Sequence, residues 1–449
     1  MVGAFTATAT ELVRDDILQS LELQNPRILV TGFDRTNLYF GVEHPRDKDA
    51  WVFRYLKAHG EDCGIIYCST RKNVDELYDR LRLEGISAAR YHAGLNQEER
   101  QQAQEDFQYD RVQVIVATNA FGMGIDKSNV RYVLHYNMPS CLENYYQEAG
   151  RAGRDGEPSE CILLFSPQDV VIQKFLLEHK EHSAALEEVE EANLRKLYAM
   201  EHYCRTTSCL RQTLLHYFGE EAPARCNHCS TCNGDYEEVD MTEETKSIVK
   251  CIHEARRPYG ITLMANVLAG SRSTRVEETG LSRLRMFGAL HNHSLKEIRE
   301  MIQNLLDQGY LLITRDKYPV LKISKKIWEL QDDSIRVLLR KEAGAADGGK
   351  SSRKKKKILP DLDLPAGFSQ EMGAELFSRL RSLRKQLAEQ AMVPPFVVFG
   401  ERTLREMCRH LPRNHEQFLQ VPGVGQHKDE KYGAAFLDAI NGFCEEKGL

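Results

Sequence analysis

The 449-residue sequence contains no apolar run that approaches the roughly 18 residues typical of a membrane-spanning helix, so no membrane span is expected. Its amino terminus has no basic segment before an apolar core, so no signal peptide is expected either. We therefore expect a cytoplasmic protein whose 12 cysteines are not paired as disulfides.

The sequence also lacks an excess of basic residues, with 60 Lys and Arg against 66 Asp and Glu and a formal net charge of −6 at pH 7. Net charge governs solubility and long-range attraction, whereas nucleic-acid binding depends on local patches. Such patches occur at Arg151/Arg154, Arg256/Arg257, Arg272/Arg275 and residues 354–357. Composition alone is therefore neutral about DNA binding.

Two motifs of ATP-hydrolysing motors are absent from the printed sequence. One is Gly-x-x-x-x-Gly-Lys-[Ser/Thr], whose backbone amides cradle ATP phosphates. The other is Asp-Glu-x-His, which holds magnesium and orients the attacking water. We therefore do not expect this chain by itself to hydrolyse ATP.

What the sequence does contain is organised around residues 114–156. Apolar runs at 114–117 and 132–136 predict two buried parallel strands, each followed by a polar or glycine-rich loop. Ligands of open α/β sheets bind at the carboxyl ends of strands. Arg151 and Arg154 are flanked by glycines and suit a bidentate grip on phosphate. The alternative is a solvated basic turn, which two such loops in succession make the weaker interpretation.

Strands and helices alternate from residue 37 to about 165, with expected strands at 63–68 and before 95 and helices at 73–83 and 98–107. Repeated βα units predict a parallel, doubly wound sheet. Ser69, Thr70 and Thr118 follow strand ends, where hydroxyl residues either cap helices or contact a nucleic-acid backbone. Their shared position favours the second interpretation.

Cys226, Cys229 and Cys232 are spaced by two residues, and Cys209 lies upstream of them. This spacing predicts a tetrahedral zinc site with thiolate ligands. The alternative is a set of unrelated buried thiols, and His228, between two of the cysteines, is a candidate substitute ligand. Zinc here is expected to be structural, with folding of the segment dependent on the metal.

The remaining segments predict smaller units. Residues 8–21 predict an amphipathic helix with a Thr8/Glu11 capping box, and residues 28–30 a strand, too little to bury a core alone. Residues 242–330 predict three helices and a hairpin, a winged-helix pattern that binds either duplex phosphates, here through Arg272 and Arg275, or proteins. A tether is expected at 341–365. Helices at 373–391, 401–410, 414–419 and 432–445 predict an independent bundle, with a glycine-rich turn at 421–425 able to bind phosphate.

Residues 147–154 resemble motif VI of superfamily-two helicases, and residues 120–126 resemble motif V in its RecQ form. The resemblance implies that Arg151 and Arg154 reach the ATP γ-phosphate as catalytic arginines. It implies that Gln147, Gly124 and Asp126 couple nucleotide state to lobe closure. Single-stranded DNA would be held by motif IV (Ser69, Thr70, Arg71), motif IVa (His92) and Thr118. All four cysteines, and not His228, are the metal ligands that the resemblance implies.

The same resemblance implies a multidomain α/β architecture: a RecA-like parallel-sheet lobe, a zinc-binding helical subdomain, a winged helix and an all-α HRDC bundle. The expected boundaries are 1–34 for the remnant of a first RecA-like lobe starting at motif III (residues 6–9), 35–195 for the second lobe, 196–240 for the zinc subdomain, 241–335 for the winged-helix RQC domain, 336–366 for a basic linker and 367–449 for HRDC. Asp429 stands where the HRDC pattern is usually apolar, so we expect looser packing or weaker DNA affinity there.

The function implied is an ATP-dependent 3′–5′ DNA helicase of recombination and repair, present without its ATP-binding lobe. Zn²⁺ is the expected cofactor, with ATP and Mg²⁺ bound only alongside the missing lobe. Expected partners are single-stranded and branched or duplex DNA in the bacterial nucleoid, and proteins through the winged helix or HRDC, but no membrane. The alternatives are a non-catalytic DNA-binding or strand-annealing module, and a zinc-stabilised protein scaffold without salt-dependent DNA affinity.

Overall fold

The structure is a computed structural model, and it describes residues 4–6, 11–22, 25–60, 62–122, 126–178, 187–234, 236–314, 320–331, 336–342, 364–365 and 368–448. The chain divides into two compact units, residues 1–170 with 353–449 and residues 171–352. Among the residues that the structure describes, no helix is both long and apolar enough to cross a membrane.

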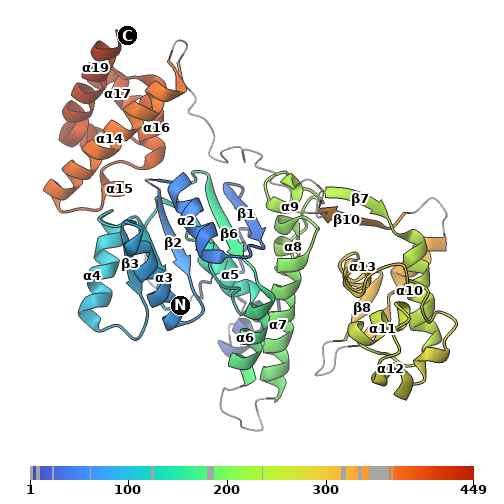
Figure 1. Ribbon diagram of the computed structural model, residues 1–449. Helices are drawn as coiled ribbons and strands as arrows, with labels where there is room; N and C mark the ends of the chain where they lie inside the picture. Colours follow the sequence, from blue (N-terminus) through green and yellow to red (C-terminus); the bar gives the residue numbers. More distant parts are fainter. Residues whose placement is uncertain are drawn as a thin grey trace. The chain divides into compact units, whose positions relative to one another are not determined.

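The first unit contains a six-stranded parallel sheet in the order β1-β6-β5-β2-β4-β3 (Figure 1). The middle strands are fully buried, as expected for β-branched runs covered on both faces. This confirms the predicted doubly wound sheet. Its strands are β1 (Leu38–Glu43), β2 (Cys63–Tyr67), β3 (Ala88–Tyr91), β4 (Val114–Ala117), β5 (Val130–His135) and β6 (Ser159–Leu164).

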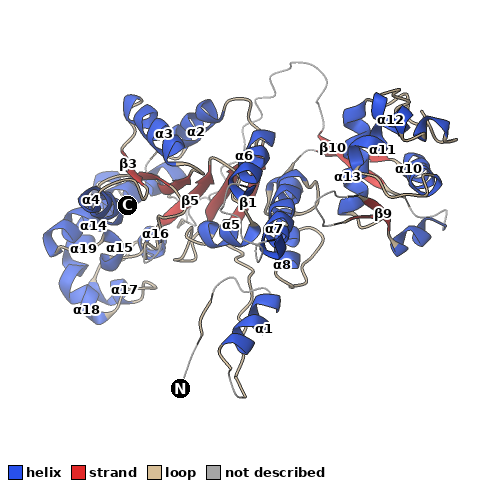
Figure 2. Ribbon diagram, turned by 90° about the horizontal axis from the view of Figure 1, so that it is seen from below, coloured by secondary structure: helices blue, strands red, loops and turns tan. Residues whose placement is uncertain are grey.

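Helices cover both faces of this sheet. Helices α2 (Lys48–Ala58) and α3 (Arg71–Leu83) bury Val52 and Leu77 against one face, while Cys161 on the other face donates its thiol hydrogen to the Ala149 carbonyl of α5 (Leu142–Ala149). Figure 2 shows α2 and α3 on one side of the strands and α5 on the other. Alternate residues of each strand thus face different helices, because side chains along a strand alternate in direction.

Local sequence fixes where several of these helices begin. The Asn96 side chain accepts a hydrogen bond from the Glu99 amide, and the Glu99 carboxylate accepts one from the Asn96 amide, a capping box that starts α4 (Gln97–Gln108). Thr70 caps α3 in the same way, accepting a hydrogen bond from the Asn73 amide. The helices expected at 73–83 and 98–107 are confirmed.

The amino-terminal segment forms helix α1 (Glu11–Ser20), as predicted, but residues 28–30 do not form the expected strand. Ile28, Leu29 and Val30 are exposed, and no described strand pairs with them. A strand needs a hydrogen-bonded neighbour, so an apolar run without one stays extended coil. The Thr8 cap and most of the segment expected as motif III lie outside the described residues.

The second unit begins in helix α6 (Pro167–Glu178) and continues through α7 (Glu187–Arg205), α8 (Leu210–Tyr217) and the short α9 (Ser230–Asn233). A separate apolar core follows, built on α10 (Thr242–Glu254), α11 (Ile261–Leu268), α12 (Thr274–Glu278) and α13 (Leu295–Asp307). The predicted hairpin is β8 (Leu311–Ile313) paired antiparallel with β9 (Leu321–Ile323), and its turn at 317–319 lies outside the described residues.

A second strand pair in this unit was not predicted. Strand β7 (Tyr236–Asp240) pairs antiparallel with β10 (Leu338–Glu342), almost 100 residues later in the chain. The Val337 amide donates to Thr242 Oγ1, which fixes the strand pair to the start of α10. β10 occupies the first part of the range expected as linker, and residues 343–363 lie outside the described part of the chain.

Residues 368–448 form the expected helical bundle with its own core. Its helices are α14 (Gln370–Ala391), α15 (Pro395–Val398), α16 (Glu401–His410), α17 (His415–Leu419), α18 (Gln426–Lys428) and α19 (Ala434–Lys447). Gly423 has φ +90°, and a Cβ there would overlap Thr403 Oγ1, so the glycine-rich turn packs on α16. Asp429 is buried, and its Oδ1 lies 2.8 Å from His415 Nδ1. Its carboxylate therefore has a polar partner, whereas looser packing was expected there.

Replacing Gly64 in β2 by alanine should destabilise the six-stranded sheet, because the new Cβ would overlap the Tyr132 ring on the adjacent β5. We expect a loss of about 3 kcal/mol, the upper part of the usual range for overpacked cores. The measurement is the opening free energy from amide hydrogen exchange of β2 and β5 in the intact chain. Gly442→Ala is the control. Gly442 lies in α19, and a Cβ added there would have no heavy atom of another part of the chain within 4 Å, so this variant should leave β2 unchanged.

Candidate functional site

The carboxyl ends of β2, β4 and β5 meet at one edge of the sheet, and the loops that follow them are tied together there. Tyr67, the last residue of β2, donates its hydroxyl hydrogen to the Phe121 carbonyl at 3.1 Å. Arg151 Nη1 donates to the next carbonyl, that of Gly122, at 2.6 Å. One turn of backbone after β4 is thus held by a strand end on one side and by an arginine on the other.

This contact depends on a glycine. Gly122 has φ +136°, a conformation that L side chains rarely adopt, and a Cβ at this position would overlap the Arg151 guanidinium. Burial raises the pKa of the Tyr67 hydroxyl, while the nearby Arg151 opposes that rise. Tyr67 therefore stays a neutral hydrogen-bond donor at physiological pH.

Helix α5, which ends just before Arg151, is fixed beneath β5 by a buried polar pair. His135 Nε2 lies 2.8 Å from Glu148 Oε2, and the His135 ring stacks on Tyr67. Neither histidine nor glutamate was recognised from the sequence. Their signal was available: two ionisable residues inside apolar runs need a partner when they are buried.

Arg154 lies on the outer side of the same turn and is ion-paired with the exposed Asp126 at 3.3 Å. Gln147 is also exposed. The structure therefore brings Arg151, Arg154 and Asp126 into one cluster with the loop after β4, whereas Gly124 lies outside the described residues. Arg151 is half-buried and Arg154 is exposed.

Two further polar residues hold the arginine turn, and the sequence did not reveal them. Arg35 Nη2 donates to the Gly153 carbonyl at 2.7 Å and to the Ala152 carbonyl at 3.2 Å. The Asn37 amide donates to the carbonyls of Gly153 and Glu157, both at 2.9 Å. These side chains tie residues 35–37 to the turn that follows α5.

The residues expected to contact DNA in this lobe have mixed surroundings. Arg71 is exposed at the start of α3, and Thr118 is half-buried after β4. Thr70 caps α3, the alternative considered for it from the sequence, and Ser69 Oγ is buried without a hydrogen-bond partner among the described residues. His92 is buried, with Nε2 3.1 Å from Asp75 Oδ1 and Nδ1 accepting the Gly94 amide, so its ring nitrogens are already engaged.

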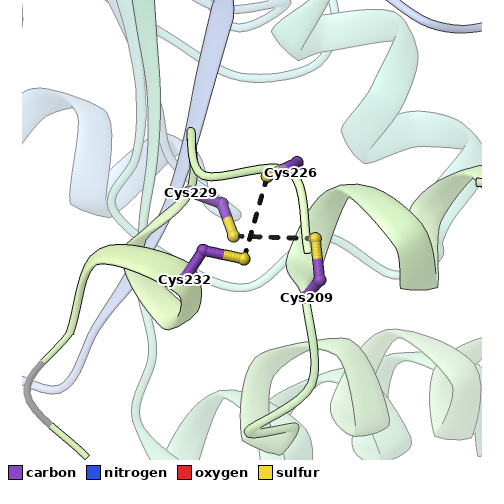
Figure 3. Close-up of side chains that lie close together, drawn as sticks. All are labelled: Cys209, Cys226, Cys229 and Cys232. Carbon is purple, nitrogen blue, oxygen red and sulfur yellow. Dashed lines mark hydrogen bonds between the residues drawn. The ribbon is translucent and has the colours of Figure 1, made fainter. Parts of the chain in front are cut away.

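The four predicted cysteines meet in the second unit (Figure 3). Their sulfur atoms all lie within 4.8 Å of one another, with Cys226 to Cys232 at 4.0 Å and Cys209 to Cys229 at 3.9 Å. Tetrahedral Zn–S bonds of about 2.3 Å require sulfur separations of about 3.8 Å. The four thiols therefore fit a structural zinc ion, which would join the start of α8 to α9.

Backbone amides donate hydrogen bonds to two of these sulfurs. The His228 amide donates to Cys226 Sγ at 3.3 Å, and the Gln212 amide donates to Cys209 Sγ at 3.5 Å. The pKa of Cys229 is lowered to about 4, chiefly by its hydrogen bond with Cys209, whereas the pKa values of Cys209 and Cys226 are raised. Because zinc binds the thiolate and not the thiol, such donors to sulfur favour the metal-bound state.

The winged-helix candidates Arg272 and Arg275 are both exposed, at and before the start of α12. Arg256, Arg257, Arg283 and Arg285 of the same region are exposed as well. All six arginines are thus exposed to solvent in the region built on α10 to α13.

Four family models match successive segments of the chain. Residues 47–156 match the helicase conserved C-terminal domain, and residues 167–233 match the RecQ zinc-binding domain. Residues 235–346 match the RQC domain, and residues 373–440 match the HRDC domain. Fold and matched domains together define a helicase carboxyl-terminal region, with a connector whose four cysteines fit zinc and two accessory domains.

The chain is similar along nearly its whole length to curated helicases. It is 41% identical to the ATP-dependent DNA helicase RecQ of Bacillus subtilis (strain 168), covering 99% of this chain and 71% of that protein. It is 34% identical to the RecQ protein of Haemophilus influenzae, covering 98% and 69%. It is 32% identical to the RecQ-like DNA helicase BLM of Xenopus laevis, covering 98% and 34%. The chain belongs to the RecQ family of helicases.

Replacing Cys226 by serine should reduce bound zinc from about one ion per chain to a small fraction, because three thiolates no longer close the tetrahedral site. The measurement is metal content by inductively coupled plasma mass spectrometry, with helix content of the variant followed by circular dichroism. Cys204→Ser is the matched control, since Cys204 is buried in α7 outside the four-sulfur cluster. Full zinc retention by Cys226→Ser would exclude the four-cysteine site.

Proposed function

We propose that this chain is the carboxyl-terminal part of an ATP-dependent DNA helicase that moves 3′ to 5′ and acts in recombination and repair. The observation that supports this most directly is the contact between Arg151 and the Gly122 carbonyl. It couples the arginine turn to the loop after β4, so that a change at one loop displaces the other. Coupling between a phosphate-sensing loop and a strand-contacting loop is what a motor needs.

In this proposal Arg151 and Arg154 stabilise negative charge that develops on the γ-phosphate during hydrolysis. Arginine fingers of this kind contribute about 10³–10⁵ in rate. Gln147 and Asp126 transmit nucleotide state, and Arg35 with Asn37 holds the arginine turn in place. The ion pair with Asp126 keeps Arg154 near its working position when no nucleotide is bound.

Thr118, Ser69 and Arg71 are proposed to hold one DNA strand, while Arg272 and Arg275 contact duplex phosphates. Movement of the strand-holding loops with each ATP then advances the lobe along one strand. Zinc fixes the connector between the two DNA-contacting parts, and the HRDC bundle is an accessory module for DNA or protein. The bacterial relatives support a cytoplasmic location close to DNA.

We assign ATP binding to the part of the relatives that this chain does not cover. The printed sequence has no P-loop and no Asp-Glu-x-His, and it covers 71% and 69% of the two bacterial relatives. For the chain by itself this favours a second function, DNA binding or strand annealing without a motor. Salt-sensitive DNA affinity with no ATP hydrolysis is the expected behaviour of the isolated chain.

In the chain joined to an ATP-binding lobe of the RecQ type, Arg154→Ala should lower DNA-stimulated ATP hydrolysis by about 10³-fold or more. DNA affinity should stay within about twofold of the parent, because Arg154 is assigned to phosphate of the nucleotide and not of DNA. Steady-state hydrolysis and fluorescence anisotropy measure the two quantities. Arg82→Ala, an exposed arginine of α3, is the control. Near-normal turnover of the Arg154 variant would refute its catalytic assignment.

Replacing Arg272 and Arg275 together by alanine should weaken duplex binding by the isolated chain and reduce the slope of log K against log salt concentration. Each lost phosphate contact lowers that slope by about 0.9, so the double variant should lose about two. Lys296→Ala on α13 is the control, because Lys296 is already ion-paired with Glu300 at 3.7 Å. An unchanged slope would show that the winged helix acts on proteins instead of duplex DNA.

A further inference from the structure

The segment between α12 and α13 carries two exposed arginines on a backbone that lies against the apolar core. This segment, residues 283–286, is called the arginine loop below. Arg283 and Arg285 are exposed on either side of Leu284. Leu284 and Met286 are half-buried and pack against the core built on α10 to α13. The loop therefore presents two cations to solvent from a backbone that its apolar side chains hold in place.

The residues that follow the arginine loop are fixed to α11 by backbone hydrogen bonds. The Gly288 amide donates to the Val267 carbonyl at 2.9 Å, and the Leu290 amide donates to the Leu268 carbonyl at 2.8 Å. Gly288 has φ +74°, and a Cβ there would come within 3.5 Å of the Gly270 Cα. These contacts fix residues 288–290, whereas the arginine loop lies before them and is tied to the domain by a side chain.

That side chain is Glu254, the last residue of α10. Its Oε1 accepts a hydrogen bond from the Arg285 amide at 3.0 Å, and its Oε2 accepts one from the Met286 amide at 3.2 Å. One carboxylate thus binds two successive amides of a segment that lies 31 residues later in the chain. Hydrogen bonds to a charged acceptor are stronger than those to a neutral one. Glu254 therefore determines where the backbone of both arginines lies.

The end of a helix is an unfavourable place for a carboxylate, because its partial charge is negative and favours cations. The two amides of the arginine loop compensate Glu254 there. Two further arginines follow the same helix end, and Arg256 has φ +57°. Among the residues that the structure describes, no ion pair involves the four arginines Arg256, Arg257, Arg283 and Arg285. Glu254 thus links two pairs of arginines through backbone contacts and leaves their guanidinium groups free for an external anion.

We propose that the arginine loop is a second phosphate-contacting site of the winged helix, with duplex DNA as its ligand, and that Glu254 is its positioning residue. The inference rests on the proposed DNA-binding function, and the site is separate from the contacts assigned to Arg272 and Arg275. A guanidinium binds phosphate oxygens through a fixed pair of donors, so its affinity depends on where its backbone lies. Glu254 therefore increases affinity for a polyanion, which is opposite to the effect of its charge alone.

Glu254→Gln in the intact chain tests the positioning role. Glutamine keeps the shape of the side chain but offers a single acceptor oxygen, so one of the two amides loses its partner. Although the change removes a negative charge, duplex affinity should fall by at least about fivefold at about 0.1 M salt, as expected when phosphate contacts are lost. Fluorescence anisotropy with a short labelled blunt duplex measures this affinity. Glu278→Gln is the matched control, because Glu278 is exposed at the end of α12 and the charge change is the same, so binding should not weaken.

A double-mutant cycle separates positioning from a general loss of structure. Replacing Arg283 and Arg285 together by alanine should lower the slope of log K against log salt by about two between about 50 and 200 mM. Adding Glu254→Gln to that variant should change affinity by less than about twofold, because the groups that Glu254 positions are gone. Added to a variant that lacks Arg272 and Arg275, the same change should keep its full effect. A full effect without Arg283 and Arg285 would overturn the positioning role.

The remaining outcomes distinguish this inference from the proposed function. Equal or tighter duplex binding by Glu254→Gln, or an unchanged salt slope without Arg283 and Arg285, would overturn the inference alone and favour an acidic protein segment as the partner of the loop. A parent chain with no salt-dependent duplex affinity would refute the proposed DNA binding and the inference together. Amide hydrogen exchange at Arg285 and Met286 should be faster in Glu254→Gln in every case, and unchanged exchange would show that Glu254 does not hold the loop.

Discussion

The parallel direction of the six strands is the constraint on which the helicase lobe depends. Because all strands run the same way, the ends of β2, β4 and β5 lie at one edge, and residues far apart in sequence become neighbours there. Tyr67, Gly122 and Arg151 are joined at that edge by two hydrogen bonds to adjacent carbonyls. A reversed strand would place these groups on opposite sides of the molecule.

The other modules differ in what holds each of them together. The zinc-binding segment has only the short helices α8 and α9 around its cysteines, whose four sulfur atoms lie close enough together to hold one metal ion. The winged helix and the HRDC bundle have apolar cores of their own, and the winged helix exposes Arg272 and Arg275 at its surface. A chain of negative net charge can therefore still expose cationic side chains locally.

The sequence by itself determined the elements and the chemistry that depend on local order. Apolar runs predicted β2, β4 and β5, the helical stretches between the strands predicted α3 and α4, and the spacing of Cys226, Cys229 and Cys232 predicted zinc, because each of these signals is local in the chain. It wrongly predicted a strand at 28–30, because an apolar run does not specify a partner. Only the tertiary structure decided that Thr70 caps a helix, that His92 is engaged by Asp75, and that Arg35 and Asn37 hold the arginine turn. Such pairings join residues more than 100 positions apart in some cases, and their geometry exists only once the sheet has brought the strand ends together.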